Sequence, residues 1–319
     1  MSEEKVLTAR LYDIQGFSVQ DGPGIRTTAF LKGCPLHCPW CHSPESQAYY
    51  PQLSYIDMRC LGVEACDSRC IKACPHNAIE LGGERLDAKT NEMLQTVHVK
   101  RDLCDNCFKC AEVCYPDALY RCGDDYTVDQ LVARLLQDRR FFKRGGGVTI
   151  SGGECLTQPA FVLEVLKRLK DEGINTAVDT TGFCKWEIIE SIMPYTDLFL
   201  YDLKHMDSEK HKAVTGVPNE IILDNCRKIA ENGGKMQIRI PVIPMFNDDE
   251  ENIRKTAEFC VPLGDAVTVI QLLPYHNLGV TKYLRISDKP VMEATPPTDE
   301  FMEKLKAIME EYGLPVTIH

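Results

Sequence analysis

From about residue 123 to its end, the chain alternates short runs of β-branched residues with longer amphipathic segments. This rhythm is typical of a parallel sheet whose strands are joined by crossover helices. The predicted strands are residues 148–151, 176–179, 198–203, 236–243, 266–273 and 315–318, with an earlier one at 27–31. Repeated units of this kind predict an α/β fold that forms a partial or complete TIM-type (β/α) barrel.

The segment 127–139 carries apolar residues at the spacing of one helix face. Thr127 and Gln130 have the spacing of a capping box, which marks a helix start. Three further helices are expected at residues 161–172, 219–232 and 298–312, and each runs into a glycine suited to a left-handed C-cap, at positions 173, 233 and 313.

Residues 52–122 break this rhythm, because they lack apolar periodicity and hold nine of the sixteen cysteines. They predict an inserted domain, with the barrel formed by residues 1–51 and 123–319. A small domain with little apolar surface is marginal alone, so metal clusters could supply the missing cohesion.

The composition narrows the function further. A formal net charge of -11 argues against binding to a phosphate backbone, which relies on clustered Lys and Arg. No apolar run is long enough to span a membrane, and the first residues lack a secretory signal pattern. We therefore expect a cytoplasmic protein that binds neither membrane nor nucleic acid. In that reducing compartment, clustered cysteines indicate metal binding or catalysis before disulfides.

The first cysteine group, Cys34, Cys38 and Cys41, has the spacing CxxxCxxC and directly follows the predicted strand 27–31. Three such ligands can hold three irons of a [4Fe–4S] cluster and leave the fourth iron open. The amino and carboxylate groups of S-adenosylmethionine (SAM) can chelate an open iron. The alternative is a zinc site of three Cys and one His, with His37 or His42 as the fourth ligand.

Two further groups lie in the predicted insert. One has the C-x2-C-x2-C-x3-C spacing of bacterial two-cluster ferredoxins, and the other is a stretched version of it. In that architecture the fourth cysteine of each motif binds the other cluster. This predicts one auxiliary cluster on Cys60, Cys66, Cys70 and Cys114, and another on Cys104, Cys107, Cys110 and Cys74. The alternative is two zinc sites of four cysteines each; Cys122 is expected to be unligated.

A glycine-rich turn ends the predicted strand 148–151 with Gly152, Gly153 and Glu154. Glycines at such a place let the backbone approach a ligand closely. No Gly-Lys-Ser/Thr follows, as a phosphate loop would require. A plain β-turn would explain the two glycines but not the glutamate.

Charged residues stand at the ends of successive predicted strands, where a barrel builds its active site. They are Asp179, Asp202, Lys204, Arg239 and His276. Their convergence predicts a polar site at one end of the barrel. Singly, Asp179 could be a helix cap, and Asp202 with Lys204 a surface ion pair.

The segment DGPGIR at residues 21–26 is by itself a tight turn. Followed by the cysteine triad, SGGE, DTTG, DLK and LPYH in this order, it resembles the glycyl radical enzyme activating enzymes of the radical SAM superfamily. The resemblance covers nearly all 319 residues. It points to the longer branch of that family, which carries a two-cluster ferredoxin-like insert.

The resemblance implies an enzyme that reductively cleaves SAM to a 5′-deoxyadenosyl radical, which abstracts a Cα hydrogen from a glycine of a partner glycyl radical enzyme. It implies three [4Fe–4S] clusters and SAM as cofactors. Gly152, Gly153 and Glu154 would bind the SAM amino group, and the SAM pocket would be completed by Asp179, Lys204, Arg239 and His276. A monovalent cation would be held by Asp179, Thr180 and Asp202. Asp21 would meet the partner's glycine loop.

A low-potential donor such as flavodoxin or ferredoxin would supply the electron, and a monomer is expected. The resemblance assigns no role to Cys155 or Thr181. Two other functions compete with glycyl radical activation. A radical SAM enzyme acting on a small molecule is disfavoured by the DGPG segment, and an iron–sulfur electron carrier would leave the barrel without a task.

Overall fold

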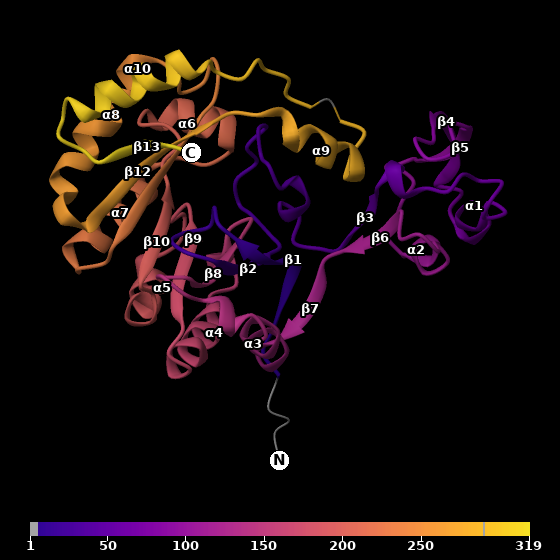
Figure 1. Ribbon diagram of the computed structural model, residues 1–319, viewed down its shortest axis with the longest axis horizontal. Coiled ribbons are helices and arrows are strands. Elements are labelled where there is room, and N and C mark those ends of the chain that lie inside the picture. The colour runs from indigo at the N-terminus through magenta and orange to yellow at the C-terminus, as the bar shows by residue number, and fades with distance from the viewer. Residues whose placement is uncertain (1–5, 290) are drawn as a thin grey trace.

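The structure is a computed structural model that describes residues 6–289 and 291–319. Its main body is a nine-stranded sheet in the order β13-β12-β11-β10-β9-β8-β2-β1-β7 (Figure 1). Seven neighbouring strands run parallel, and they confirm all seven predicted strands: β2 (Arg26–Leu31), β8 (Gly147–Gly152), β9 (Asn175–Thr180), β10 (Leu198–Asp202), β11 (Met236–Val242), β12 (Val267–Pro274) and β13 (Val316–Ile318).

Two antiparallel strands at one edge were not predicted. β1 (Thr8–Ser18) pairs with β2, and β7 (Asp124–Thr127) pairs with β1 on its other side. Within the described residues no pairing joins β7 to β13, so the sheet curves without closing. The barrel is therefore partial.

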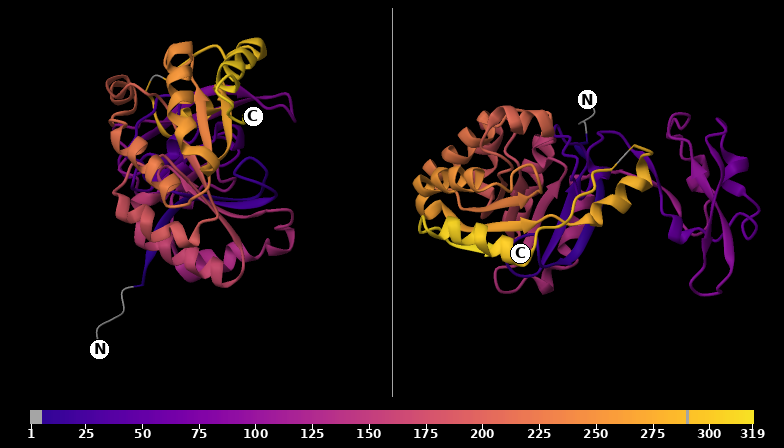
Figure 2. Two further views of the ribbon diagram at one scale, coloured as in Figure 1. Left: turned by 90° about the vertical axis from the view of Figure 1, so that its left-hand side faces the viewer. Right: turned by 90° about the horizontal axis from the view of Figure 1, so that it is seen from above.

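Helices cover the outer face of the curved sheet (Figures 1 and 2). They are α3 (Val128–Leu136), α4 (Pro159–Asp171), α5 (Trp186–Ile192), α6 (Ser208–Thr215), α7 (Glu220–Glu231), α8 (Glu250–Cys260) and α10 (Asp299–Glu310). The predicted capping box is present, because Gln130 N donates to Thr127 Oγ1 at 3.2 Å and Thr127 N donates to Gln130 Oε1 at 2.9 Å. The three glycines expected beyond α4, α7 and α10 all have positive φ. None of the described helices has the length and apolar character needed to cross a bilayer.

The barrel core lies between the sheet and these helices. Leu131 of α3 and Leu166 of α4 are fully buried in one cluster with Val148 and Ile150 of β8. Burying one such side chain contributes about 1.5–3 kcal/mol. The core therefore holds the strands in place from the outer side and leaves their carboxyl ends free to carry polar residues.

The DGPGIR segment has a structural role that the sequence did not indicate. The Arg26 side chain is fully buried, and it donates from Nε to Thr149 Oγ1 at 2.7 Å and from Nη2 to the Val148 carbonyl at 2.6 Å. Its Nη1 reaches Asn175 Oδ1 at 3.0 Å. Arg26 thus joins β2, β8 and β9 at their amino ends.

The segment between β2 and β7 forms a separate small body on one side of the barrel (Figures 1 and 2). Its elements are the antiparallel pair β3 (Gln52–Tyr55) and β6 (Leu119–Cys122), the hairpin β4 (Ile79–Leu86) and β5 (Met93–Val99), and two short helices, α1 (Arg69–Ala73) and α2 (Lys109–Glu112). Helices α1 and α2 pack against each other. On the barrel side, α9 (Val280–Ile286) packs against β3.

Candidate active site

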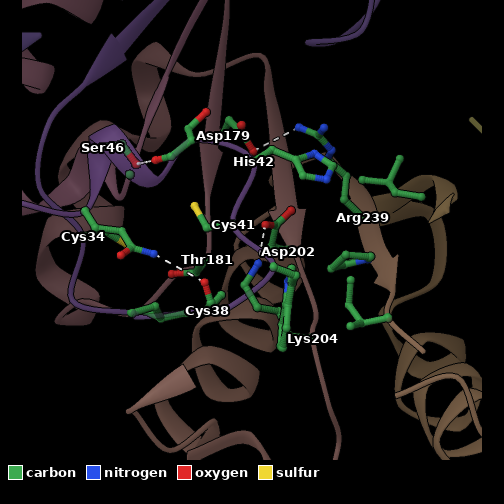
Figure 3. Close-up of a pocket in the computed structure, with 18 of the residues that line it drawn as sticks. Cys34, Cys38, Cys41, His42, Ser46, Asp179, Thr181, Asp202, Lys204 and Arg239 are labelled. Carbon is green, nitrogen blue, oxygen red and sulfur yellow. Dashed lines mark hydrogen bonds and ion pairs between the residues drawn. The ribbon is translucent and has the colours of Figure 1, made fainter. Parts of the chain in front are cut away.

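A cavity of about 220 Å³ lies at the carboxyl ends of the parallel strands (Figure 3). It brings together residues that the sequence predicted separately. The predicted residues that line it are Cys34, Cys38, Cys41, Gly152, Gly153, Asp179, Thr180, Asp202, Lys204 and Arg239. Apolar side chains, among them Leu36, Ile243 and Leu273, complete the wall.

The loop that carries the triad folds back on itself after β2. Gly33 N donates to the Ser46 carbonyl at 2.6 Å, and Cys34 N donates to the Gln47 carbonyl at 3.1 Å. Cys34 and Cys38 are buried, and Cys41 is half-buried. Burial raises the pKa of the Cys38 thiol to about 12, and the nearby Lys204 opposes that rise. A buried thiolate therefore needs a positive centre beside it, such as iron.

The three thiols surround the cavity and do not meet at one point. Among residues 6–289 and 291–319, no three His, Cys, Asp or Glu side chains are close enough to share a single metal ion. A cluster that binds each thiol through a separate iron suits this spread arrangement. His42 lines the cavity, whereas His37 does not, and the His37 amide donates to the Thr215 carbonyl at 2.8 Å.

Two ion pairs face the cavity from the strand ends (Figure 3). Arg239 Nη1 lies 3.3 Å from Asp179 Oδ1, and Lys204 Nζ lies 2.8 Å from Asp202 Oδ2. Burial raises the pKa of Asp179 to about 6, which Arg239 opposes and the Asp202 charge reinforces. The Lys204 side chain is only 9% exposed, so this is not a surface pair. Nor is Asp179 a helix cap, since Lys185 occupies that position before α5.

Arg239 also supports a ligand in this cavity. Its Nε is buried and has no hydrogen-bond partner among the described residues. A buried donor left unpaired costs free energy unless a ligand or water accepts from it. A carboxylate such as that of SAM would satisfy it.

The glycine turn lies directly behind the triad loop. A Cβ on Gly153 would lie 2.8 Å from the Cys34 Cβ, and one on Gly152 would lie 2.1 Å from the Leu31 carbonyl oxygen. Only glycine allows this close approach, so the turn sets the position of Cys34.

Glu154 differs from the expected arrangement. Its side chain is fully buried and does not line the cavity. Its carboxylate accepts hydrogen bonds from Thr180 Oγ1 at 2.7 Å and from Thr181 N at 2.8 Å. The structure therefore gives the Glu154 carboxylate the task of holding the Thr180–Thr181 turn, and contact with the SAM amino group stays a prediction for the two glycines. Thr181, which had no assigned role, is this partner of Glu154.

Two other predicted residues lie outside the cavity lining. The His276 ring stacks on His42 with centroids 3.8 Å apart, so it backs a residue that lines the cavity. Asp21 precedes β2, and its Oδ2 accepts hydrogen bonds from Ser18 Oγ at 2.6 Å and Thr28 Oγ1 at 2.7 Å.

The sequence profile of the radical SAM superfamily matches residues 106–257. The isethionate sulfite-lyase activating enzyme of Oleidesulfovibrio alaskensis is 40% identical over 311 residues, covering 96% of this chain and 96% of that protein. The indoleacetate decarboxylase activating enzyme of Tractidigestivibacter scatoligenes is 38% identical and covers 100% of this chain and 99% of its own length. The trans-4-hydroxy-L-proline dehydratase activating enzyme of Clostridioides difficile is 41% identical, with coverages of 93% and 95%.

The chain belongs to the glycyl radical enzyme activating enzymes. Membership of this radical SAM family implies a [4Fe–4S] cluster and SAM as cofactors. The three thiols and the unpaired Arg239 Nε fit these two groups.

The insert of this activating enzyme contains two small cysteine-lined cavities. We call the set Cys74, Cys104, Cys107 and Cys110, which lines one of them, the inner group. We call the set Cys60, Cys66, Cys70 and Cys114, which lines the other, the outer group. The structure thus brings together the two crosswise sets expected for ferredoxin-like clusters, while the clusters themselves stay a prediction. Cys122 is buried in β6 and lines neither cavity.

Sequence reasoning missed several residues that support the activating enzyme's triad loop. Tyr283 of α9 donates to the Cys38 carbonyl at 3.0 Å across 245 positions of sequence. Trp40 packs its ring on Phe246 at 4.7 Å between centroids. Neither contact has a local sequence signal, because both partners come from later loops and helices.

Proposed function

We propose that this protein activates a partner glycyl radical enzyme by cleaving SAM reductively and removing a hydrogen atom from one glycine of that partner. The observation that carries the proposal is the single cavity at which the cysteine triad, the glycine turn and the charged strand ends meet. The sequence predicted each part separately, and full-length relatives at about 40% identity are named as activating enzymes.

Cys34, Cys38 and Cys41 would hold the SAM-binding cluster. When bound, the cluster and SAM together supply an electron and the 5′-deoxyadenosyl radical that takes the glycine hydrogen. The protein's own residues bind and orient these groups and exclude water, since the cofactors supply the chemistry that side chains cannot.

The two ion pairs give the cavity its polarity. Arg239 and Lys204 offer cationic donors to the SAM carboxylate, and Arg239 has a free buried Nε for this purpose. Asp179, Thr180 and Asp202 place oxygen atoms on the same wall, which supports the proposed monovalent cation. The apolar wall, with Ile243 and Leu273, suits the adenosyl part of SAM.

The auxiliary clusters belong to the same proposal. Each of the two insert cavities is lined by four cysteines in the crosswise arrangement of two-cluster ferredoxins. We propose that both hold [4Fe–4S] clusters and receive electrons from a low-potential donor such as flavodoxin or ferredoxin. We also propose a monomeric enzyme, with Asp21 near the partner's glycine loop.

The relatives at similar identity are named for three different partner enzymes, a sulfite-lyase, a decarboxylase and a dehydratase. The partner is therefore defined here by class, as a glycyl radical enzyme.

The test is anaerobic SAM cleavage followed by radical transfer. Reconstituted protein reduced with dithionite should release methionine and 5′-deoxyadenosine, and a matching partner should then show a glycyl radical doublet by electron paramagnetic resonance (EPR). Cys38→Ser should abolish both signals. The matched control is Cys184→Ser, because Cys184 is half-buried and lies outside all three cysteine groups. Cleavage at the wild-type rate by C38S would overturn the proposal.

A further inference from the structure

Helix α9 lies between the barrel and the insert and contacts both (Figures 1 and 2). On one side it packs against β3, the first strand of the insert. On the other it packs against the 3-10 turn Pro44–Ser46, which closes the triad loop. One short helix therefore touches both iron-binding regions.

The contacts of α9 with the triad loop are specific. Tyr283 Oη donates to the Cys38 carbonyl at 3.0 Å, and Lys282 Nζ lies 3.3 Å from Glu45 Oε1. Just before the helix, a Cβ on Gly279 would lie 2.9 Å from the Cys41 carbonyl oxygen. A shift of α9 would therefore move or release the backbone of two triad cysteines.

The contacts of α9 with the insert centre on Arg101. Its Nη1 donates to the Leu53 carbonyl of β3 at 2.6 Å, and its Nη2 donates to the Arg285 carbonyl of α9. The Arg101 amide donates to Asp288 Oδ2 at 3.3 Å, just beyond the helix. Burial lowers the pKa of Arg101, and Asp288 and Cys104 oppose that shift.

These contacts connect to the inner group, because Arg101 lies three positions before Cys104 and Leu53 lines the inner cavity. A continuous chain of contacts therefore runs from the inner group through Arg101, α9 and Tyr283 to Cys38. The outer group has a different setting. Every residue that lines its cavity lies between Tyr55 and Leu119, inside the insert. Two of them, Leu61 at 50% and Tyr115 at 86% exposure, face solvent.

We propose that α9, through Arg101 and Tyr283, fixes the inner group next to the triad loop, so that the inner group passes electrons to the triad and the outer group receives them from the donor protein. This inference rests on the proposed function and its auxiliary clusters. One electron leaves a reduced flavin or iron–sulfur carrier, passes from the outer to the inner group, and reduces the triad site by one. The carrier is oxidised by one electron, and no proton moves.

The test uses the full-length, iron-loaded protein and a reduced flavodoxin as the probe. Arg101→Gln removes both side-chain links to β3 and α9, and Tyr283→Phe removes the hydrogen bond to Cys38 while keeping the ring. We expect amide hydrogen exchange across residues 280–286 to rise about ten-fold, equivalent to ~1.4 kcal/mol. Freeze-quench EPR should show that flavodoxin-driven reduction of the triad cluster slows by a similar factor.

Two controls isolate the link. Arg85→Gln is the matched variant, because Arg85 Nη2 donates to the Cys60 carbonyl at 2.7 Å in the outer group, and exchange in α9 should not change. Titanium(III) citrate reduces all the clusters directly, so R101Q should keep wild-type reduction with it.

Unchanged exchange in both variants, or raised exchange with wild-type flavodoxin-driven reduction, would overturn the inference. Failure of the wild type to cleave SAM with titanium(III) would instead refute the proposed function.

Discussion

The barrel and the insert are held together in different ways. The barrel has one large apolar cluster formed by strands and helices, and its functional side chains stand at the ends of strands that this cluster already holds. The insert has eight buried residues in its cluster, and two of them, Cys70 and Cys110, belong to the cysteine groups. Three more cysteines, Cys74, Cys104 and Cys114, pack against the same cluster.

This difference indicates opposite orders of dependence. In the barrel, apolar burial forms the fold and the fold then positions the site. In the insert, the thiols are a large part of the core, so the bound clusters would supply stability that apolar burial does not. Each prediction below separates the two regions by perturbing one of them.

The largest effect is expected from removing iron. Anaerobic chelation should leave residues 52–122 with rapid amide hydrogen exchange, because folding of a small metal-dependent domain is coupled to metal binding. Strands β8 to β12 should keep their protection, since their neighbours are apolar. Mass spectrometry resolves both regions in one sample. Equal loss of protection in barrel and insert would contradict the comparison.

A smaller but selective effect is expected for Cys114→Ala. Cys114 belongs to the second sequence motif, but it lines the outer cavity with Cys60, Cys66 and Cys70. The variant should lose about four irons per chain, those of the outer cluster, and keep the inner one. Iron analysis and EPR of the reduced protein measure this. Cys122→Ala is the control and should lose none, whereas loss of the inner cluster in C114A would disprove the crosswise pairing.

In the barrel, Arg239→Gln should weaken SAM binding without unfolding the sheet. The substitution removes the cation beside Asp179 and the free Nε donor. Losing one buried charged contact to a ligand costs about 2 kcal/mol, or ~30-fold in Kd. Anaerobic equilibrium binding measures the change. Arg254→Gln, which removes an exposed pair with Glu311, is the control, and an R239Q affinity within about three-fold of wild type would refute the role.

The smallest effect is expected at a helix cap. Thr127→Ala removes the acceptor for Gln130 N at the start of α3 and should destabilise the barrel by about 1 kcal/mol. Urea unfolding followed by circular dichroism measures this shift. Thr295→Ala, at an exposed position, should change nothing. A similar effect from both substitutions would show that the cap does not contribute.

The sequence predicted the parallel strands well, because buried strands leave continuous β-branched runs such as 148–151. It did not indicate β1 and β7, since these antiparallel edge strands have few consecutive apolar residues and pair only after the insert returns the chain to the barrel.

The site was predictable to a similar degree. Strand-end residues such as Asp179 and Arg239 were found because a barrel gathers strand ends. The direction of the Glu154 side chain was not, because it depends on hydrogen bonds to another strand's turn. The Tyr283 contact with Cys38 was equally hidden, since it joins segments far apart in the sequence.

The central claim is that Cys34, Cys38 and Cys41 hold a cluster with one iron free to bind SAM. EPR of the dithionite-reduced protein, recorded before and after SAM is added, tests this claim most directly. Our account predicts that SAM changes the signal of the triad cluster and leaves the signals of the insert clusters unaltered. An unchanged triad signal with SAM present, or zinc in place of iron at these three cysteines, would contradict it.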